Sequence, residues 1–270
     1  MRLFQIMNIL SIDVAFGAAI SCLFFAKLCN VEIFPIELVV LILTVWIIYT
    51  LDHLMDARGL TRPASTKRHR FHQLNFSAIR GWLFVAGIVN VILVCFIRRP
   101  LYLTGGALTL MICFYFLFQR RQEAFKEVAG AVLYMSGVLI IPLTLFNGMV
   151  SYEKVIIIFQ FGCIVLTNLL LFALFDEQTD KNDNHLSFTI SFGPTTTRNV
   201  LVALFVMSAS LSIVQLLWLR FALGANIVLT TMNVVLFFVF IKRSCVEKDE
   251  WYRLIGDGVF LIPALYILFS

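Results

Sequence analysis

Charged residues are scarce in this sequence. Only 14% of its 270 residues are Asp, Glu, Lys or Arg, whereas a soluble domain carries about 25%. In their place the chain has 60% hydrophobic residues and a mean hydropathy of +0.92. Its apolar runs approach or reach the length of about 20 residues that crosses a bilayer. The composition therefore excludes a soluble globular domain and predicts an all-α integral membrane protein.

Other sequence signals are missing as well. The six cysteines show no CxxC spacing, and because most lie in apolar runs we expect them to be small buried hydrophobes. No small-residue cleavage site follows the first apolar run, so we expect no cleaved signal peptide and a working protein that begins at Met1. No linker or low-complexity tract divides the chain. We therefore expect residues 1–270 to form a single helical transmembrane domain.

Nine apolar runs are predicted to cross the membrane. They cover residues 8–27, 35–51, 79–97, 100–118, 128–147, 154–175, 198–219, 221–241 and 254–269. Most Lys and Arg residues lie before the first span or in the loops that follow even-numbered spans, which places the N-terminus and those loops in the cytoplasm and the C-terminus outside. Since this bias accounts for the net charge of +5, we expect a bilayer and no nucleic acid as partner.

Two pairs of aspartates stand where an apolar run ends. Asp52 and Asp56 follow the second predicted span, and Asp176 and Asp180 follow the sixth. Residues four apart share one face of a helix, and the C-terminal end of a helix disfavours negative charge unless a cation is present. The second and sixth spans run in the same direction, so both pairs should face one cytoplasmic cavity and act there as catalytic or metal-binding groups.

Carboxylates with no cysteine or histidine shell suit a hard cation. Mg²⁺ takes one or two carboxylates together with substrate phosphates, so the pattern predicts Mg²⁺ held against a diphosphate. The nearby cations that we expect to bind that diphosphate are Arg58, Arg120, Arg121 and Lys126. The positive-inside bias alone accounts for most other basic residues.

Two further features have competing interpretations. His53, His69 and His72 could suggest zinc, but no third soft ligand stands near the HxxH pair, so exposed loop histidines are the favoured interpretation. Asp13 lies inside the first predicted span, where an ionisable residue is a functional candidate. It could instead lie near the interface, paired with Ser11 or Asn8.

The two aspartate pairs resemble the motifs of the UbiA superfamily of intramembrane prenyltransferases. That family's first motif, NDxxDxxxD, aligns with residues 48–56, where Asp52 and Asp56 match and Ile48 and Tyr49 replace the Asn and the first Asp. Asp176-Glu-Gln-Thr-Asp180 is similar to the second motif. Arg62-Pro63, and Tyr115 followed by Arg120 and Arg121, also match the family's pattern. The number of helices and the positions of the motifs extend the resemblance over nearly the whole chain.

This resemblance implies a bundle of nine transmembrane helices. It also implies transfer of a prenyl group from a polyprenyl diphosphate to a hydrophobic, lipid-soluble acceptor such as an aromatic ring. Mg²⁺ would then be held by Asp52, Asp56, Asp176 and Asp180. The departures at Ile48 and Tyr49 bear on the number of metal ions and on the acceptor.

Two alternatives stay open. A CDP-alcohol phosphatidyltransferase would share Asp52, Asp56 and the Ala57-Arg58 pair. Its pattern also needs further aspartates downstream, and none occurs between Gly59 and Arg80. A membrane transporter or lipid-binding scaffold would instead require polar residues near mid-membrane and broken helices.

Overall fold

The computed structural model describes residues 3–58, 60, 62–118, 123–219 and 223–269. Within these residues the chain is helical, and nine segments are long and apolar enough to cross a membrane. The prediction of an all-α membrane protein with nine spans is confirmed. The longer helices are α2 (Ile12–Cys29), α3 (Pro35–Arg58), α5 (Phe76–Val94), α6 (Pro100–Phe118), α7 (Lys126–Leu145), α8 (Tyr152–Phe175), α11 (Pro194–Val214) and α12 (Leu223–Ile241).

Short helices link or extend the spans. They are α1 (Leu3–Ile9), α4 (Lys67–Leu74), α9 (Glu177–Asp183), α10 (Phe188–Phe192), α13 (Arg243–Val246), α14 (Trp251–Gly258) and α15 (Ala264–Phe269). Pro35, Pro100 and Pro194 each begin a helix, where the missing N–H of proline costs nothing. Asn30 ends α2 in the left-handed conformation, with φ of 51°.

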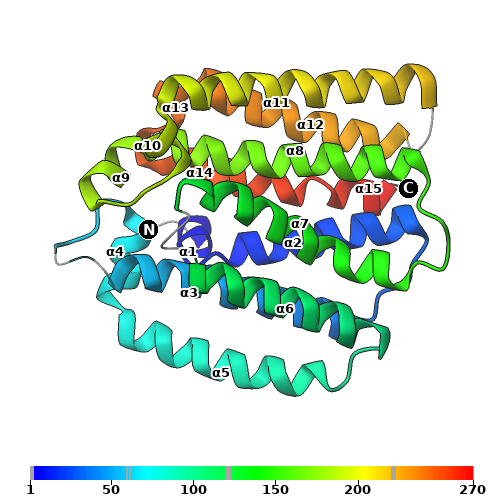
Figure 1. The fold of residues 1–270 in the computed structure, drawn as a ribbon, viewed down its shortest axis with the longest axis horizontal. Coiled ribbons are helices and arrows are strands. Elements are labelled where there is room, and N and C mark those ends of the chain that lie inside the picture. The colour runs from blue at the N-terminus through cyan, green and yellow to red at the C-terminus, as the bar shows by residue number, and fades with distance from the viewer. Residues whose placement is uncertain (1–2, 59, 61, 119–122, 220–222, 270) are drawn as a thin grey trace.

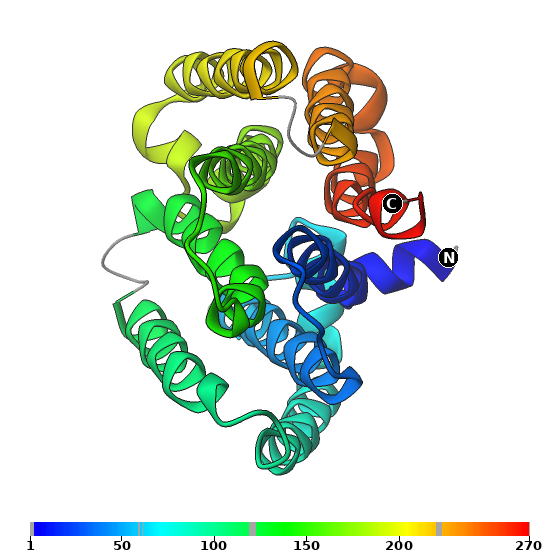
Figure 2. The ribbon, with the colours of Figure 1, turned by 90° about the vertical axis from the view of Figure 1, so that its right-hand side faces the viewer.

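The spans lie roughly parallel in a bundle (Figure 1), and the view along the bundle shows how they are layered (Figure 2). Helices α2 and α8 bury much of their surface and pack against several neighbours. Helices α5 and α6 lie at one edge of the bundle, and in each only one residue is buried, Ile79 and Leu101 respectively. Because the outward-facing surface of these two helices is mainly apolar, we assign it to lipid contact.

Helices α3 and α8 end at the same end of the bundle, on the left of Figure 1. We call it the aspartate end, because Asp52, Asp56, Asp176 and Asp180 lie there. Helices α4 and α9 continue the chain at this end and cover it. The parallel course predicted for the second and sixth spans is therefore observed.

Two predicted spans are interrupted. The first is divided at Ser11, which has a φ of 54°, so that α1 is separate from the spanning helix α2. The last span contains α14, a 3₁₀ turn at Val259–Leu261 and then α15. Pro263 has no N–H to continue the helical ladder, which accounts for this second break.

Candidate active site

The first aspartate pair lies on the last turns of α3. Lys126, the first residue of α7, places its Nζ 2.9 Å from Asp56 Oδ2 and 3.4 Å from Asp52 Oδ2. One ammonium group thus bridges both carboxylates. The two carboxylates share a face at the negative end of the α3 dipole, so this cation relieves their repulsion.

The second pair differs in its helix context. Asp176 stands between α8 and α9, so it ends the first helix and also precedes the N-terminus of the second, where negative charge is favourable. The expectation that both pairs stand at a helix C-terminus therefore holds for Asp176, which caps α8, and is wrong for Asp180, which lies in the first turn of α9. The sequence pattern did not separate α9 from α8, and the chain turns between them.

Asp176 is buried and its two oxygens have separate partners. Arg253 Nη2 lies 2.6 Å from Oδ2, and the Tyr252 hydroxyl donates a hydrogen bond to Oδ1. Asp180 lies one turn further along α9. Burial and the negative charge of Asp176 raise the pKa of Asp180 to about 7. A cation that approached this pair would lower that pKa and favour the charged form.

Two histidine rings flank Asp56. His69 of α4 and His185 are stacked with their ring centroids 5.7 Å apart. His69 Nε2 lies 3.9 Å from Asp56 Oδ2, and His185 Nδ1 lies 4.0 Å from Asp56 Oδ1. Burial lowers the pKa of His69 to about 3, although the Asp56 carboxylate opposes the shift. His69 is therefore neutral at physiological pH.

The expectation of exposed loop histidines is wrong. His53 and His72 are buried, and His69 lines the cavity described below. The physical reason is that residues 67–74 form α4, which packs against the end of α3. In the described part of the chain, no three His, Cys, Asp or Glu side chains are grouped so that they could hold a metal ion.

The four cations predicted to bind the diphosphate differ in where they lie relative to the aspartates. Lys126 lies at the first aspartate pair, as described, whereas Arg58 is exposed and is not among the residues that line the cavity. Arg120 and Arg121 lie outside the described residues. Arg68 and Arg253, neither of which was predicted, line the cavity instead. The charge pattern of Arg253 and Asp257 at an apolar run is the signal that sequence reasoning passed over.

Arg68 belongs to a buried polar cluster beside the site. Its Nη2 lies 3.1 Å from Asp257 Oδ2 and 3.1 Å from Asn8 Oδ1. Asn8 Nδ2 in turn donates to Asp257 Oδ2 at 2.9 Å and to Asp13 Oδ2 at 2.6 Å. Asp13 thus pairs with Asn8 in the first turn of α2, which is the structural interpretation left open for it. The cluster connects α1, α2, α4 and α14.

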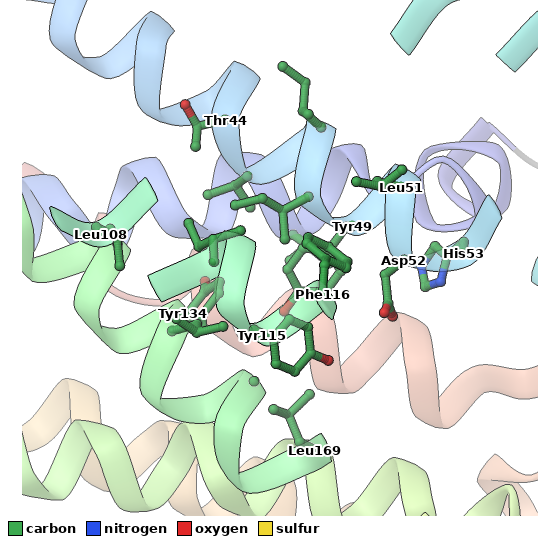
Figure 3. Close-up of a pocket in the computed structure, with 18 of the residues that line it drawn as sticks. Thr44, Tyr49, Leu51, Asp52, His53, Leu108, Tyr115, Phe116, Tyr134 and Leu169 are labelled. Carbon is green, nitrogen blue, oxygen red and sulfur yellow. The ribbon is translucent and has the colours of Figure 1, made fainter. Parts of the chain in front are cut away.

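A cavity of about 790 Å³ joins both aspartate pairs. All four aspartates line it, together with Lys126 and Arg253. Away from them its walls are mainly apolar, and examples from five helices are Val45, Val94, Ile112, Leu133 and Leu169. The rings of Tyr49, Tyr115 and Phe116 gather between Asp52 and these walls (Figure 3). The charged residues therefore concentrate at the aspartate end of the cavity, and the walls beyond it are mainly apolar.

The cavity extends far from the aspartates. Glu37, in the first turn of α3, also lines it. Because a helix rises about 1.5 Å per residue, Glu37 and Asp52 are separated by about 22 Å along α3. Glu37 is paired with Arg98, whose Nε lies 2.6 Å from Glu37 Oε1. The cavity thus follows α3 through most of the thickness of a bilayer.

The prediction that the cysteines are buried is confirmed for only three of the six. Cys22, Cys29 and Cys163 are buried, whereas Cys95, Cys113 and Cys245 are exposed. Cys113 lies on α6, an edge helix. The expectation of burial is wrong for these three residues: Cys95 follows α5 at the edge of the bundle, Cys113 lines the cavity, and Cys245 lies on the short helix α13.

No family model matches the sequence, and no curated protein matches it. Solved structures do match the fold. A UbiA homolog from Archaeoglobus fulgidus bound to DMAPP and Mg²⁺ has a TM-score of 0.62 at 11% identity, with 98% of this chain and 99% of that chain covered. The apo structure of a UbiA homolog from Aeropyrum pernix K1 has a TM-score of 0.67 at 11% identity, over 94% and 97% of the two chains.

This chain has the UbiA fold. The fold also matches a structure of digeranylgeranylglyceryl phosphate synthase, with a TM-score of 0.56 at 14% identity and 96% of each chain covered. The resemblance predicted from the two aspartate motifs is confirmed at the level of the fold. Because the UbiA matches extend over almost the full length of both chains, the helices of this chain follow the UbiA order from beginning to end.

Proposed function

We propose that this chain transfers a prenyl group from a polyprenyl diphosphate to a lipid-soluble acceptor within the membrane, with Mg²⁺ as the cofactor. The observation that carries the proposal is a cavity with a strongly charged end at the aspartates and mainly apolar walls beyond it. A prenyl diphosphate has the same division, because its diphosphate is a polyanion and its tail is a hydrocarbon. The UbiA homolog from Archaeoglobus fulgidus, bound in separate structures to DMAPP and to GPP, each with Mg²⁺, supports this assignment.

The donor set suits Mg²⁺ at the second aspartate pair. Asp176 and Asp180 are hard oxygen ligands one helical turn apart, and Mg²⁺ commonly binds through one or two carboxylates plus substrate phosphates. The first pair fits a metal less well, because Lys126 already bridges Asp52 and Asp56. When bound, Mg²⁺ would neutralise charge on the departing diphosphate.

The residues of the chain would act on both halves of the substrate. Lys126 and Arg253 line the charged end and would donate hydrogen bonds to phosphate oxygens as the allylic carbon–oxygen bond breaks and the diphosphate leaves with the electron pair. The rings of Tyr49, Tyr115 and Phe116 stand beside this end and would stabilise the allylic cation through their faces. The acceptor then bonds to that carbon and loses a proton.

An aromatic acceptor is the finer part of this proposal. The rings of Tyr49, Tyr115, Phe116 and Tyr134 line the cavity beyond Asp52. Aromatic rings pack well against one another, so a flat aromatic acceptor suits these walls.

The test is product formation by the purified full-length chain in lipid vesicles. Labelled geranylgeranyl diphosphate, Mg²⁺ and candidate acceptor lipids are supplied, and lipid extracts are searched for a prenylated product. Asp52→Asn and Asp180→Asn should each reduce turnover by at least about a hundredfold, since each weakens the charged end. The matched control is Asp249→Asn, which changes an exposed aspartate outside the cavity at a φ of 59° that Asn tolerates.

Normal turnover in both cavity variants would overturn the site assignment. Uptake of a different solute without Mg²⁺, and with no prenylated product, would favour the transporter alternative instead.

A further inference from the structure

The ammonium group of Lys126 lies between Asp52 and Asp56, where a bridging cation would lie. Its Nζ contacts one oxygen of each carboxylate in the first pair, at 2.9 Å from Asp56 and 3.4 Å from Asp52. The side chains of Lys126, Asp52 and Asp56 are each no more than 25% exposed. Their attraction is therefore screened less by water and salt than that of a surface pair.

We propose that Lys126 takes the place of a metal ion between Asp52 and Asp56, so that this chain holds its divalent cation at Asp176 and Asp180 alone. This inference rests on the proposed function, because it concerns which part of the same site is occupied by metal. It identifies Lys126 as a built-in cation at the diphosphate end of the cavity.

The face of α3 that carries the first pair supports this inference. Residues 48, 52 and 56 are spaced four apart and share that face. Ile48 is apolar, so the turn before Asp52 adds no carboxylate oxygen to the pair. Two carboxylates with one lysine between them make a compact ion cluster, in which a cation already occupies the position between the carboxylates.

Lys126 is held in position by its own helix. It begins α7, and the neighbouring Glu127 accepts the backbone N–H of Phe188 at 3.2 Å from each carboxylate oxygen. The start of α7 is thus tied to α10 through Glu127, next to Lys126. A metal entering the first pair would have to displace the Lys126 ammonium group.

The second pair has a different arrangement. Arg253 contacts Asp176 through Oδ2 and forms an ion pair with no oxygen of Asp180 in the described structure. This cation therefore does not bridge the pair, and among the described residues no ion pair places a cation between the two carboxylates. Lys126 also lines the cavity, so the third N–H of its ammonium group can meet a phosphate oxygen.

The number of bound metal ions tests the inference without any measure of turnover. Mn²⁺ is the probe, and the bound ions per purified full-length chain are counted by equilibrium dialysis and by the paramagnetic resonance signal of the free ion. The wild type should bind one Mn²⁺. Lys126→Met, which keeps the length of the side chain and removes its charge, should bind two.

Two controls separate charge from shape. Lys126→Arg keeps a cation and should stay at one ion, whereas the triple variant K126M/D52N/D56N should return from two ions to one. If Lys126→Met does not fold, Lys126→Gln replaces it with the same expected gain. A neutral variant that folds and binds no more Mn²⁺ than the wild type overturns the inference, as does a wild type that binds two.

The same experiment distinguishes failure of the proposed function from failure of the inference about Lys126. A wild type that binds no Mn²⁺ would contradict the metal site at Asp176 and Asp180. A gain of one ion on Lys126→Met would still support the role of Lys126 in that case.

Discussion

Asp176 and Asp180 are one helical turn apart, yet their surroundings give them different tasks. Asp176 is paired with buried Arg253 and hydrogen-bonded to Tyr252. By contrast, burial and the charge of Asp176 both disfavour the ionised form of Asp180. Asp176 thus contributes to the stability of the fold as well as to the site. Asp180 has a raised pKa and contributes to the site at the expense of stability.

We expect Asp176→Asn to destabilise the protein by about 3–5 kcal/mol, because it leaves the Arg253 charge buried without its partner. Asp180→Asn should leave stability unchanged or raise it slightly, since it removes a repelled charge. Denaturant unfolding of both variants in detergent measures the difference. Equal loss of stability in the two variants would contradict this division of roles.

A second prediction at the scale of residues concerns the buried ion pair between Arg68 and Asp257. Arg68→Met should destabilise the protein strongly because Asp257 then stays buried without a cation. Adding Asp257→Leu to it should restore part of the loss, since neither charge remains. A double-mutant cycle on unfolding free energies measures this coupling, and additive effects would show that the two side chains do not act as a pair.

At the scale of helices, close contacts depend on small residues. A Cβ atom built on Gly17 of α2 would lie 2.8 Å from the Cβ of Phe260, so the helix and the last span approach too closely for a larger residue. Gly87 of α5 has no atom within 4 Å of such a Cβ, because it faces outward from the edge of the bundle. Membrane helices commonly pack through small residues in this way.

Gly17→Ala should therefore lower stability by about 1–3 kcal/mol through overpacking. Gly87→Ala should be neutral or slightly stabilising, because alanine favours the helix and meets no neighbour. Thermal unfolding of the two variants in the same detergent compares them directly. If Gly87→Ala is the more harmful change, the packing described for α2 and α5 is wrong.

The helices themselves were largely predictable from the sequence. Apolar runs of spanning length carry a strong signal, and the starts at Pro35 and Pro100 agreed with the structure. The breaks near Ser11 and in the last span were not predicted, because hydropathy continues through both. Helix α4 was also missed, since a basic segment that closes over the cavity has the composition of a loop.

The candidate site was predictable only in part. The two aspartate pairs could be found because their spacing recurs at two run ends. The contacts of Lys126 with Asp56 and of Arg253 with Asp176 join residues 70 and 77 positions apart. No local pattern encodes such contacts, since they depend on how α3, α7, α8 and α14 pack together.

At the scale of the whole molecule, charge asymmetry predicts how the protein sits in the membrane. The aspartate end should face the cytoplasm, following the excess of Lys and Arg in its loops. Cys245 is exposed just after α12 at the aspartate end, and Cys95 is exposed just after α5 at the opposite end.

Single-cysteine variants retaining Cys95 or Cys245 test this orientation in sealed right-side-out vesicles. A membrane-impermeant thiol reagent should label Cys95 in intact vesicles and Cys245 only after the vesicles are opened. Labelling in the reverse order would place the aspartate end outside.

The central claim is that carboxylates from two distant segments serve one site for a metal-bound diphosphate. Calorimetric titration of the wild type with geranylgeranyl diphosphate, with and without Mg²⁺, tests it most directly. We predict binding that requires Mg²⁺ and that weakens by at least about tenfold, or 1.4 kcal/mol, in both Asp52→Asn and Asp180→Asn. Asp180→Asn removes a proposed metal ligand, and Asp52→Asn removes a carboxylate that positions Lys126. Binding that is independent of Mg²⁺, or that is unchanged when either segment loses its aspartate, would contradict the claim.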